Sequence, residues 1–308
     1  MDSLLMNEAN PGSRPPVTVM LSFDVDGPAG SMDPERPTAA SFARGEFTVP
    51  ATHRILQLLH ERDLPATFFV PGQTAEAYPD VVTAIRERGH EIGHHGYAHE
   101  NPLTLTPDDE EQALQHGSDV LEALTGERPV GYRAPCWEHS GATTILLAQH
   151  GFRYDSSLMG HDLEPYWCRT QDIWQPKAPI AFGERLPLVE LPVAWHLDDF
   201  PQFEFAMDGH TVVPGLAPAS AVYETWTADL DYACAEQPGG VLVYTMHPEV
   251  IGRGHRLRML RRFLDHCLER GDVTFGRGVD IARAWAARQN SKFGDGLPDQ
   301  AYPTKVQR

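Results

Sequence analysis

The sequence predicts a single-domain α/β protein built on a parallel β-sheet that is either open or closed into a barrel. Short runs of β-branched and aromatic residues alternate with amphipathic helical segments over most of the chain. The 308 residues are enough to bury one large core. A hydrophobic content of 41% and a charged content of 22% are ordinary for a globular enzyme.

Strands are expected where apolar, β-branched or aromatic residues follow one another without helical spacing. They are residues 17–23, 66–70, 90–97, 130–135, 188–195 and 239–248. Helices are expected where apolar residues recur at helical spacing. The clearest begins with Thr106 as its N-cap and Pro107 at its first position, and ends before Gly126. The predicted helices are residues 51–63, 81–89, 106–126, 142–151, 256–271 and 280–289.

Three segments lie outside this alternation. Residues 1–16 are expected to form an N-terminal arm, and residues 289–308 a polar C-terminal tail, on either side of a folded domain at 17–288. Within the domain, residues from about 155 to 209 are rich in Trp, Tyr, Phe, Pro and acids. This composition predicts a long inserted loop region that covers a site.

The charge and the cysteine pattern exclude several classes of function. A net charge of −18 repels DNA, RNA and anionic membranes, so neither nucleic acid nor a membrane is an expected partner. The first residues lack the layout of a secretion signal, and no apolar run has the length of a membrane span. The four cysteines form no Cys-x-x-Cys pair, which fits reduced thiols. A cytoplasmic location is expected.

Two carboxylates follow the first predicted strand, in the segment SFDVDGP at residues 22–28. Asp24 and Asp26 are two residues apart, so both point to the same side of an extended backbone. Carboxylates that share a face repel each other unless a cation or a proton lies between them. The alternative interpretation is a turn in which an Asp caps the bend at Gly27.

Histidines that could complete a metal site lie in HEIGHHGYAHENP, residues 90–102. Neighbouring glycines argue against a helix here, but a strand that ends at His95 and a tight loop that returns His99 would bring the two rings together. With Asp26 they form a set that suits Zn²⁺, Co²⁺, Fe²⁺ or Mn²⁺ and leaves one position open for water. His90 is expected at a helix end or on the surface. The alternative is a hydrogen-bonded histidine loop without a metal.

Three more polar clusters follow predicted strands. They contain His247 in YTMHPEV, Arg133, Cys136, Trp137 and Glu138 in YRAPCWEHS, and Trp195, Asp198 and Asp199 in VAWHLDDFP. Each cluster alone could serve packing or a solvated loop. Because the carboxyl ends of parallel strands meet at one edge of a sheet, where the active sites of such proteins gather, the five clusters together predict an active site.

The ordered series SFDVDG, HGYAHENP, YRAPCW, LPVAWHLDD and MHP resembles the polysaccharide deacetylase family, whose members remove N-acetyl groups from amino sugars. The resemblance extends from about residue 20 to residue 285. It is strongest to a branch that holds peptidoglycan deacetylases, cyclic imide hydrolases and, more distantly, a metal-free allantoinase group. It implies a distorted (β/α)7-type barrel with one divalent metal ion at its mouth, zinc first and cobalt, manganese or iron as alternatives. Because this branch is often oligomeric, a homo-oligomer is a further expectation.

The resemblance also implies roles for individual residues. Asp26, His95 and His99 would be the metal ligands. Asp24 would be the general base that takes a proton from the attacking water, and His247 the general acid that protonates the departing nitrogen. The first motif reads Asp-Val-Asp, where many members of the family have adjacent aspartates.

Further residues would complete the pocket by the same resemblance. Arg133 would tether the base, the backbone N–H of Cys136 would donate to the oxyanion, and Trp195 would form a wall. Trp137 and Glu138 are additional candidates for the pocket. Cys136 stands where the family usually has a tyrosine or phenylalanine.

These parts predict a metal-dependent hydrolase that cleaves a carbon–nitrogen bond other than a peptide bond. The acid His247 must stay protonated, and Asp198 or Asp199 could be the carboxylate that supports it. The insertion at 155–209 and the expected cytoplasmic location favour a compact substrate, such as a cyclic imide, a ureide or a small N-acyl compound.

Two alternatives remain open at this point. The first is deacetylation of an N-acetylglucosamine unit in peptidoglycan, in a chitooligosaccharide or in a soluble precursor. The second, from another class, is a carbohydrate- or metabolite-binding protein that kept the fold and lost turnover. The presence of Asp24, both ligating histidines and His247 argues against a dead site.

Overall fold

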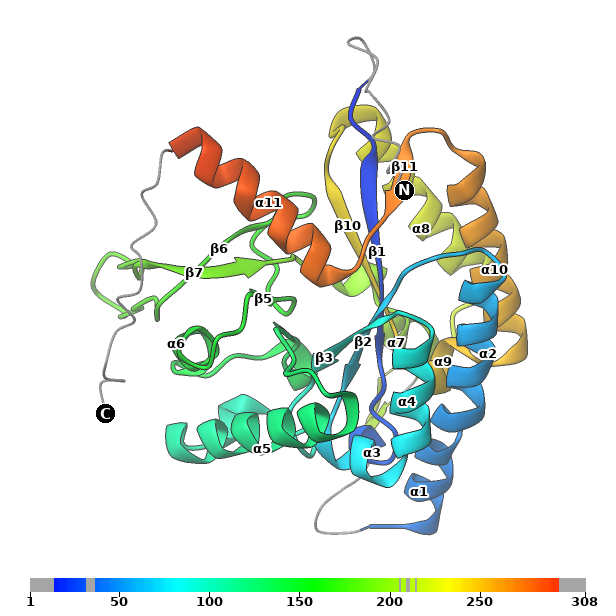
Figure 1. Ribbon diagram of the computed structural model, residues 1–308, viewed down its shortest axis with the longest axis horizontal. Helices are drawn as coiled ribbons and strands as arrows, with labels where there is room; N and C mark the ends of the chain where they lie inside the picture. The colour runs from blue at the N-terminus through cyan, green and yellow to red at the C-terminus, as the bar shows by residue number, and fades with distance from the viewer. Residues whose placement is uncertain (1–13, 32–36, 205, 209–210, 214, 294–308) are drawn as a thin grey trace, which may run out of the picture.

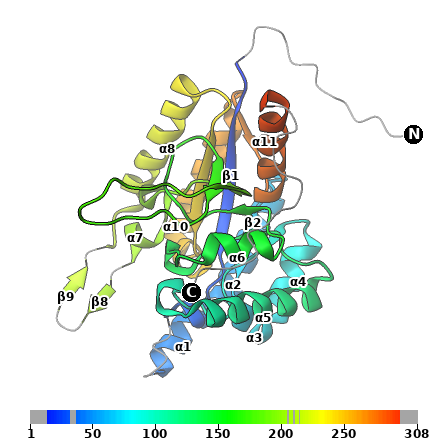
Figure 2. The same cartoon turned by 90° about the vertical axis from the view of Figure 1, so that its left-hand side faces the viewer.

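One curled sheet lies at the centre of the protein, with helices on its outer side (Figure 1). The computed structural model describes residues 14–31, 37–204, 206–208, 211–213 and 215–293. These residues contribute nine strands to the sheet: β1 (Val17–Asp24), β2 (Thr67–Val70), β3 (Glu91–His94), β4 (Gly131–Tyr132), β5 (Tyr154–Asp155), β6 (Tyr166–Arg169), β7 (Arg185–Glu190), β10 (Val241–Met246) and β11 (Val273–Phe275). A hairpin of β8 (Ala206–Asp208) and β9 (Thr211–Val213) projects away from the sheet (Figure 2).

The strand order is β10-β1-β2-β3-β4-β5-β7-β6, and β11 also pairs with β1. These pairs are parallel except for β6 with β7. Isolated backbone contacts join the two edges of the sheet, β10 at one edge and the segments next to β6 and β7 at the other. The N–H of Val241 donates to the carbonyl of Leu163 (2.8 Å), and Asp198 forms a parallel bridge with Thr245. The sheet is thus curled into an incomplete barrel, which confirms the predicted distorted barrel of parallel strands.

The helices follow the strands as the sequence predicts. They are α1 (Ala39–Glu46), α2 (Thr48–His60), α3 (Gly72–Ala77), α4 (Pro79–Glu87), α5 (Pro107–Thr125), α6 (Thr143–Gln149), α7 (Phe200–Phe203), α8 (Ala219–Glu236), α9 (Pro248–Ile251), α10 (Gly254–Glu269) and α11 (Gly278–Phe293). Of these, α2, α4, α5, α6, α10 and α11 correspond to predicted helices, whereas the short helices α1, α3, α7 and α9 were not predicted. The long helix α8 was not predicted either, although its buried Val222, Trp226, Leu230 and Ala233 recur at helical spacing. Within the part of the chain that the structure describes, no helix is both long and apolar enough to cross a membrane.

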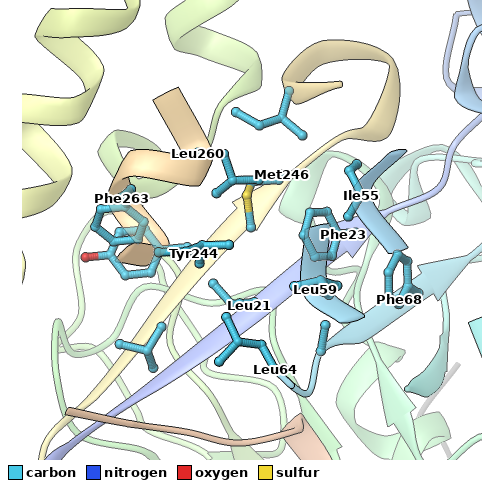
Figure 3. Packing of buried hydrophobic residues seen from close by; sticks show 14 of the residues in the cluster. Leu21, Phe23, Ile55, Leu59, Leu64, Phe68, Tyr244, Met246, Leu260 and Phe263 are labelled. Atoms are coloured by element: carbon cyan, nitrogen blue, oxygen red, sulfur yellow. The ribbon is translucent and has the colours of Figure 1, made fainter. Parts of the chain in front are cut away.

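The pleat of β1 separates an outer core from an inner one. Leu21 and Phe23 belong to the outer cluster, where Ile55 of α2 packs beside them (Figure 3). Met20 belongs to an inner cluster, enclosed by the curled sheet. Because successive side chains of a strand point to opposite faces, Asp24 lies on the same inner face as Met20.

Strand β10 repeats this arrangement beside β1, in a register that pairs Phe23 with Met246. Tyr244 and Met246 point into the outer cluster, against helix α10 (Figure 3). Val243 points into the inner cluster, so His247, which directly follows β10, lies on the inner face as well.

Helix α11 covers the amino ends of two strands. The N–H of Gly278 donates to Thr67 Oγ1 (2.9 Å) at the start of β2, and the N–H of Val279 donates to Glu91 Oε2 (3.0 Å) at the start of β3. Trp285 of the same helix packs into the inner cluster. The predicted site residues lie at the opposite, carboxyl end of the strands.

Two predicted boundaries need correction. The segment 155–209 is not only an inserted loop region, because it supplies β7 to the parallel part of the sheet and β6 to its edge. Leu186 and Leu188 of β7 anchor it through a buried cluster beside α6. Helix α11 continues past the predicted end of the domain at residue 288. Residues 1–13 of the predicted arm and 294–308 of the predicted tail lie outside the described residues.

Replacement of a core aromatic should test the outer cluster. Phe263 of α10 is fully buried against Trp226 and Tyr244. Phe263→Ala should lower the free energy of unfolding by about 3–5 kcal/mol, because it leaves a cavity. Leu268 is half-exposed on the same helix, and Leu268→Ala should change it by less than about 0.5 kcal/mol. Guanidinium unfolding followed by circular dichroism measures both, and equal losses would contradict this packing.

Candidate active site

Three possible metal donors converge at the carboxyl ends of β1 and β3. The distance from Asp26 Oδ1 to His95 Nε2 is 3.3 Å, and that from Asp26 Oδ2 to His99 Nε2 is 3.4 Å. One donor atom from each of these residues lies within 4.8 Å of the others. Asp26 Oδ1 is buried and has no hydrogen-bond partner among the described residues. An unpartnered carboxylate oxygen between two imidazoles fits a site for a cation.

The strand end brings both aspartates onto one face, as the sequence predicts. The N–H of Val25 donates to the carbonyl of Phe69 (2.8 Å), so β-type pairing continues past Asp24. Val25 is fully buried in the outer cluster, whereas Asp24 and Asp26 both approach His95 Nε2, at 3.8 and 3.3 Å. The Asp-Val-Asp spacing therefore keeps both carboxylates at the site.

A tight loop returns His99 towards His95. His99 itself has a positive φ of 57°, and Gly96 before it has a φ of 73°, a region that glycine enters without strain. Glu100 fixes the loop, because its side chain accepts the N–H groups of Tyr97 (2.9 Å) and Ala98 (2.5 Å). The two imidazole rings then meet edge to face, with their centroids 5.0 Å apart.

Hydrogen bonds decide which histidines face the site. His95 Nδ1 lies 2.7 Å from the carbonyl of Arg133, which can only accept, so Nδ1 carries a hydrogen and Nε2 is the nitrogen that faces Asp26. His94 uses both nitrogens elsewhere: Nε2 contacts the carbonyl of Leu114 (3.1 Å), and Nδ1 accepts the N–H of Gly96 (3.1 Å). Burial lowers the pKa of His94 to about 3, so it is a neutral structural residue.

The remaining histidine of this segment lies away from the site. His90 packs against Phe68 of the outer cluster, with ring centroids 5.4 Å apart. Burial lowers its pKa to about 4, and the charges of Arg88 and Arg277 act in the same direction. The position before β3, just after α4, agrees with the predicted helix end.

A buried arginine holds Asp24 inside the barrel. Arg133, which follows β4, is fully buried and donates from Nη1 to Asp24 Oδ1 and to Ser22 Oγ, both at 2.8 Å. Its Nε and Nη2 donate to the carbonyl and the hydroxyl of Ser156, again at 2.8 Å. The guanidinium also lies 4.4 Å from the centre of the Phe69 ring. These bonds fix Asp24 Oδ1 and leave Oδ2 turned towards the site.

On the other flank, Asp199 is the direct partner of His247. Asp199 Oδ1 lies 2.8 Å from His247 Nδ1, and the carboxylate also accepts the backbone N–H of His247. Asp198 Oδ1 is 3.7 Å from Nδ1 and accepts the N–H of Phe200 (2.8 Å) instead. His247 Nε2 points towards the site, 3.9 Å from Asp26 Oδ2.

The carboxylates around His247 determine its charge. Burial disfavours the imidazolium, but Asp198, Asp199 and Asp26 outweigh this effect and raise the pKa of His247 well above its ordinary value. Burial also raises the pKa of Asp198 to about 7, and the charge of Asp199 adds to the rise. His247 is therefore protonated at neutral pH, with Asp199 beside it.

The predicted pocket residues lie on two loops that meet. Cys136 and Trp137 have positive φ angles of 61° and 54° in a short turn after β4. Trp137 is buried and stacks on the half-exposed Trp195 at 4.3 Å between ring centroids. Glu138 is exposed beside them. Burial, followed by the charges of Asp26 and Glu138, raises the pKa of the Cys136 thiol, so it is not an activated thiolate.

Several residues around the site were not predicted. They are Ser22 and Ser156 beside Arg133, Phe200 against His247, and Glu249, whose carboxylate accepts the hydroxyl of Thr48. Burial raises the pKa of Glu249 to about 8, and the charge of Asp26 acts in the same direction. Ser22 shares the inner face of β1 with Asp24, so strand parity was a signal for it. The others follow strands without a distinctive motif.

Comparisons with known proteins agree with this site and fold. A model of the polysaccharide deacetylase family matches residues 12–154. The chain is 34% identical to a protein of Helicobacter pylori named peptidoglycan deacetylase, over 90% of this chain and 98% of the relative. It is 29% identical to a peptidoglycan deacetylase-like protein of Gibberella zeae, over 80% and 79% of the two chains.

Solved structures show the same architecture. A structure from Mycobacterium smegmatis assigned to the polysaccharide deacetylases is 34% identical and superposes with a TM-score of 0.76, over 90% of this chain and 93% of the other. An allantoinase structure that is 24% identical superposes with a TM-score of 0.72, over 93% and 97% of the chains, and this likeness shows the fold alone.

The fold, the site and the comparisons define a hydrolase that acts on carbon–nitrogen bonds other than peptide bonds. Within that class, the chain belongs to the polysaccharide deacetylase family. Members of this family generally use a divalent metal ion, and the donor set of Asp26, His95 and His99 agrees with that property.

The buried ion pair between Arg133 and Asp24 should respond strongly to loss of one partner. Arg133→Met should lower the free energy of unfolding by about 3–5 kcal/mol, because it leaves the Asp24 carboxylate buried and uncompensated. Adding Asp24→Asn should recover part of this loss, with a coupling energy of about 1–3 kcal/mol. Urea unfolding in the presence of a chelator measures the cycle.

The exposed pair of Arg169 and Asp172 provides the matched control. Its double-mutant cycle should give a coupling energy below about 1 kcal/mol, because solvent screens both charges. If the buried pair gave no more coupling than this exposed pair, the inferred role of Arg133 would be wrong.

Proposed function

We propose that this protein is a metal-dependent deacetylase that hydrolyses the N-acetyl group of an amino sugar, either within a glycan such as peptidoglycan or in a soluble precursor. One observation carries the proposal. Asp26, His95 and His99 converge at the mouth of the barrel, with Asp24 on one flank and protonated His247 on the other. The two relatives named as peptidoglycan deacetylase and deacetylase-like protein support this substrate class.

The three donors fit a divalent ion. Their two nitrogens and one oxygen form a borderline-soft set for which zinc is the first choice. Bound there, the ion would make an amide carbonyl more electrophilic and a water molecule more acidic. Asp26 Oδ1 has no hydrogen-bond partner among the described residues, and Nε2 is the His95 nitrogen available to an ion because Nδ1 already donates to the carbonyl of Arg133.

Asp24 is the general base in this proposal. Its Oδ2 lies 3.8 Å from His95 Nε2, close enough to the centre of the site to take a proton from the attacking water. Arg133 holds the opposite oxygen, so the carboxylate cannot rotate away. Arg133 is itself held in place by hydrogen bonds to Ser22 in β1 and to Ser156, which follows β5.

His247 is the general acid that protonates the departing sugar nitrogen. Its Nε2 faces the site, and Asp199 on Nδ1 orients the ring and stabilises the imidazolium. The N–H of Cys136 is the proposed oxyanion donor. The stacked rings of Trp137 and Trp195 offer an apolar wall for the acetyl group or the sugar ring.

Deacetylation, the first alternative to the predicted compact substrate, has the better support. The preference for a cyclic imide or ureide depended on the expected cytoplasmic location and on an insertion at 155–209 that narrows the mouth. The structure places a small part of this segment in the sheet, as β6 and β7, and leaves Trp195 half-exposed at the site. A cytoplasmic location, a homo-oligomer and the identity of the metal as zinc stay predictions from the sequence.

Activity assays should separate these substrates. The wild-type protein should release acetate from N-acetylglucosamine oligomers or peptidoglycan fragments and leave succinimide intact. His247→Ala should lower kcat by about 10²–10⁴-fold, because the leaving nitrogen loses its proton donor, while the metal content stays the same. His53→Ala, which removes an exposed histidine of α2, serves as the control. Ring opening of succinimide without acetate release would refute the proposal.

Metal analysis should identify the ligands. Purified wild-type protein should contain about one equivalent of a divalent metal, and Asp26→Asn or His99→Ala should lose most of it, because a three-ligand site tolerates few losses. His90→Asn, in the same segment but outside the site, should keep the metal. Elemental analysis after dialysis measures all of them. Full metal content in His99→Ala would remove His99 from the ligand set.

A further inference from the structure

The carboxylate of Asp155 is connected to two separate parts of the turn after β4, to one through Ser157 and to the other directly. Asp155 ends β5 and is fully buried. Its Oδ1 accepts the hydroxyl of Ser157 (2.6 Å), and this hydroxyl accepts the backbone N–H of Ala134 (2.8 Å). Its Oδ2 lies 3.1 Å from Nε2 of His139. Ala134 and His139 are the two ends of the segment that we call the oxyanion loop, residues 134–139.

The oxyanion loop has a backbone that needs external support. Cys136 and Trp137 are consecutive residues with positive φ, and neither is glycine. Such residues cost about 1–3 kcal/mol each and persist only where the surroundings hold them. In the part of the chain that the structure describes, the backbone hydrogen bonds within the loop are short-range, from Trp137 N–H to the carbonyl of Ala134 (3.1 Å) and from Glu138 N–H to that of Pro135 (3.4 Å).

Geometry places a ring nitrogen of His139 beside the buried carboxylate of Asp155. A carboxylate with no exposure requires a nearby cation or a proton. The neighbouring Glu190 takes the proton: burial and the charge of Asp155 raise its pKa well above the ordinary value. Burial opposes ionisation of Asp155 too, but the neighbouring His139 outweighs it, with help from Ser157, and lowers the pKa of Asp155. Asp155 Oδ2 and His139 Nε2 approach at ion-pair distance without the alignment of a hydrogen bond. His139 itself is nine-tenths buried, so solvent screens the pair weakly.

Glu190, at the end of β7, holds the backbone that follows β5 in place. Its Oε1 accepts the backbone N–H groups of Ser157 and Leu158, both at 2.9 Å. Ser157 therefore cannot shift without breaking bonds to Asp155, Glu190 and Ala134. The end of β5 acts as a rigid base for the oxyanion loop.

We propose that Asp155 is a positioning residue that clamps both ends of the oxyanion loop, through Ser157 to Ala134 and directly to His139. The clamp holds Cys136 in the backbone conformation that aims its N–H at the reacting carbonyl. This inference rests on the proposed function for the role of that N–H. Asp155 touches no substrate, so its effect on turnover acts through the loop.

Cys136 offers a direct reporter of the loop. It is the exposed cysteine, whereas Cys168, Cys234 and Cys267 are buried. A thiol reagent such as 5,5′-dithiobis(2-nitrobenzoic acid) should therefore react first at Cys136 in the native protein, and Cys136→Ser should abolish this fast phase. His139→Ala removes the second contact of the clamp and leaves the bonds from Asp155 through Ser157 to Ala134 in place, so it should fold. It should accelerate the reaction about tenfold, the equivalent of about 1.4 kcal/mol.

Two variants control this measurement. His139→Gln can still donate an N–H to Asp155 and should restore most of the wild-type rate. His150→Ala removes another partly buried histidine–carboxylate pair, with Glu111 at 2.8 Å, that lies outside the loop. It should leave the reaction of Cys136 unchanged. Equal reaction rates in wild-type protein and in His139→Ala would overturn the clamp.

Variants that loosen the oxyanion loop should also have a lower kcat. His139→Ala and Asp155→Asn should lower kcat by about 10–10²-fold, because a displaced oxyanion donor loses stabilisation of the transition state. KM and metal content should stay near wild type, and His139→Gln should rescue kcat. A lower melting temperature with an unchanged kcat would mean a purely structural role and would overturn the proposal.

The two readouts separate this inference from the proposed function. If wild-type protein releases no acetate from any glycan, the proposed function fails, and the reaction of Cys136 still tests the clamp. If acetate is released but neither Cys136 nor kcat responds to His139→Ala, the clamp fails and the proposed function stands.

Discussion

The register between β1 and β10 is the constraint on which the site depends. Phe23 pairs with Met246, and both point outward into the helix-covered core. Asp24 and His247 follow these residues and therefore share the inner face at the carboxyl ends of the two strands. A shift of one residue in either strand would turn its functional side chain into the outer core. Burial of the outward aromatic and aliphatic residues thus fixes the placement of the catalytic candidates.

The buried charged side chains at the carboxyl ends of these strands form separate groups, in each of which opposite charges lie side by side. Arg133 neutralises Asp24 on one flank, and His247 meets Asp199 on the other. Between them, the carboxylate of Asp26 faces His95 and His99. Each flank is held by hydrogen bonds from neighbouring strands, so base and acid keep fixed positions on opposite sides of the donor set. A reaction that takes a proton on one side and gives one on the other requires this separation.

The sequence predicted the parts of the site that depend on local geometry. The two-residue spacing placed Asp24 and Asp26 on one face, and the glycine-containing loop brought His99 back to His95. It could not choose between Asp198 and Asp199, because the bridge of residue 198 to Thr245 decides which carboxylate meets His247. The contact of Asp155 with His139 could not be predicted either, because it depends on how the end of β5 packs against a loop that follows β4. The predicted insertion at 155–209 failed in part because a composition rich in Pro and aromatic residues hid β6 and the first half of β7, whose last residues fall in the predicted strand 188–195.

The central claim is that Asp26, His95 and His99 bind one divalent ion. Anomalous diffraction at the zinc absorption edge, from crystals grown with zinc, tests it most directly. The account predicts a peak about 2.0–2.2 Å from a carboxylate oxygen of Asp26 and from Nε2 of both histidines. A peak only at another cluster of possible ligands, such as Asp155, Cys168 and Glu190, or no peak at all, would contradict it.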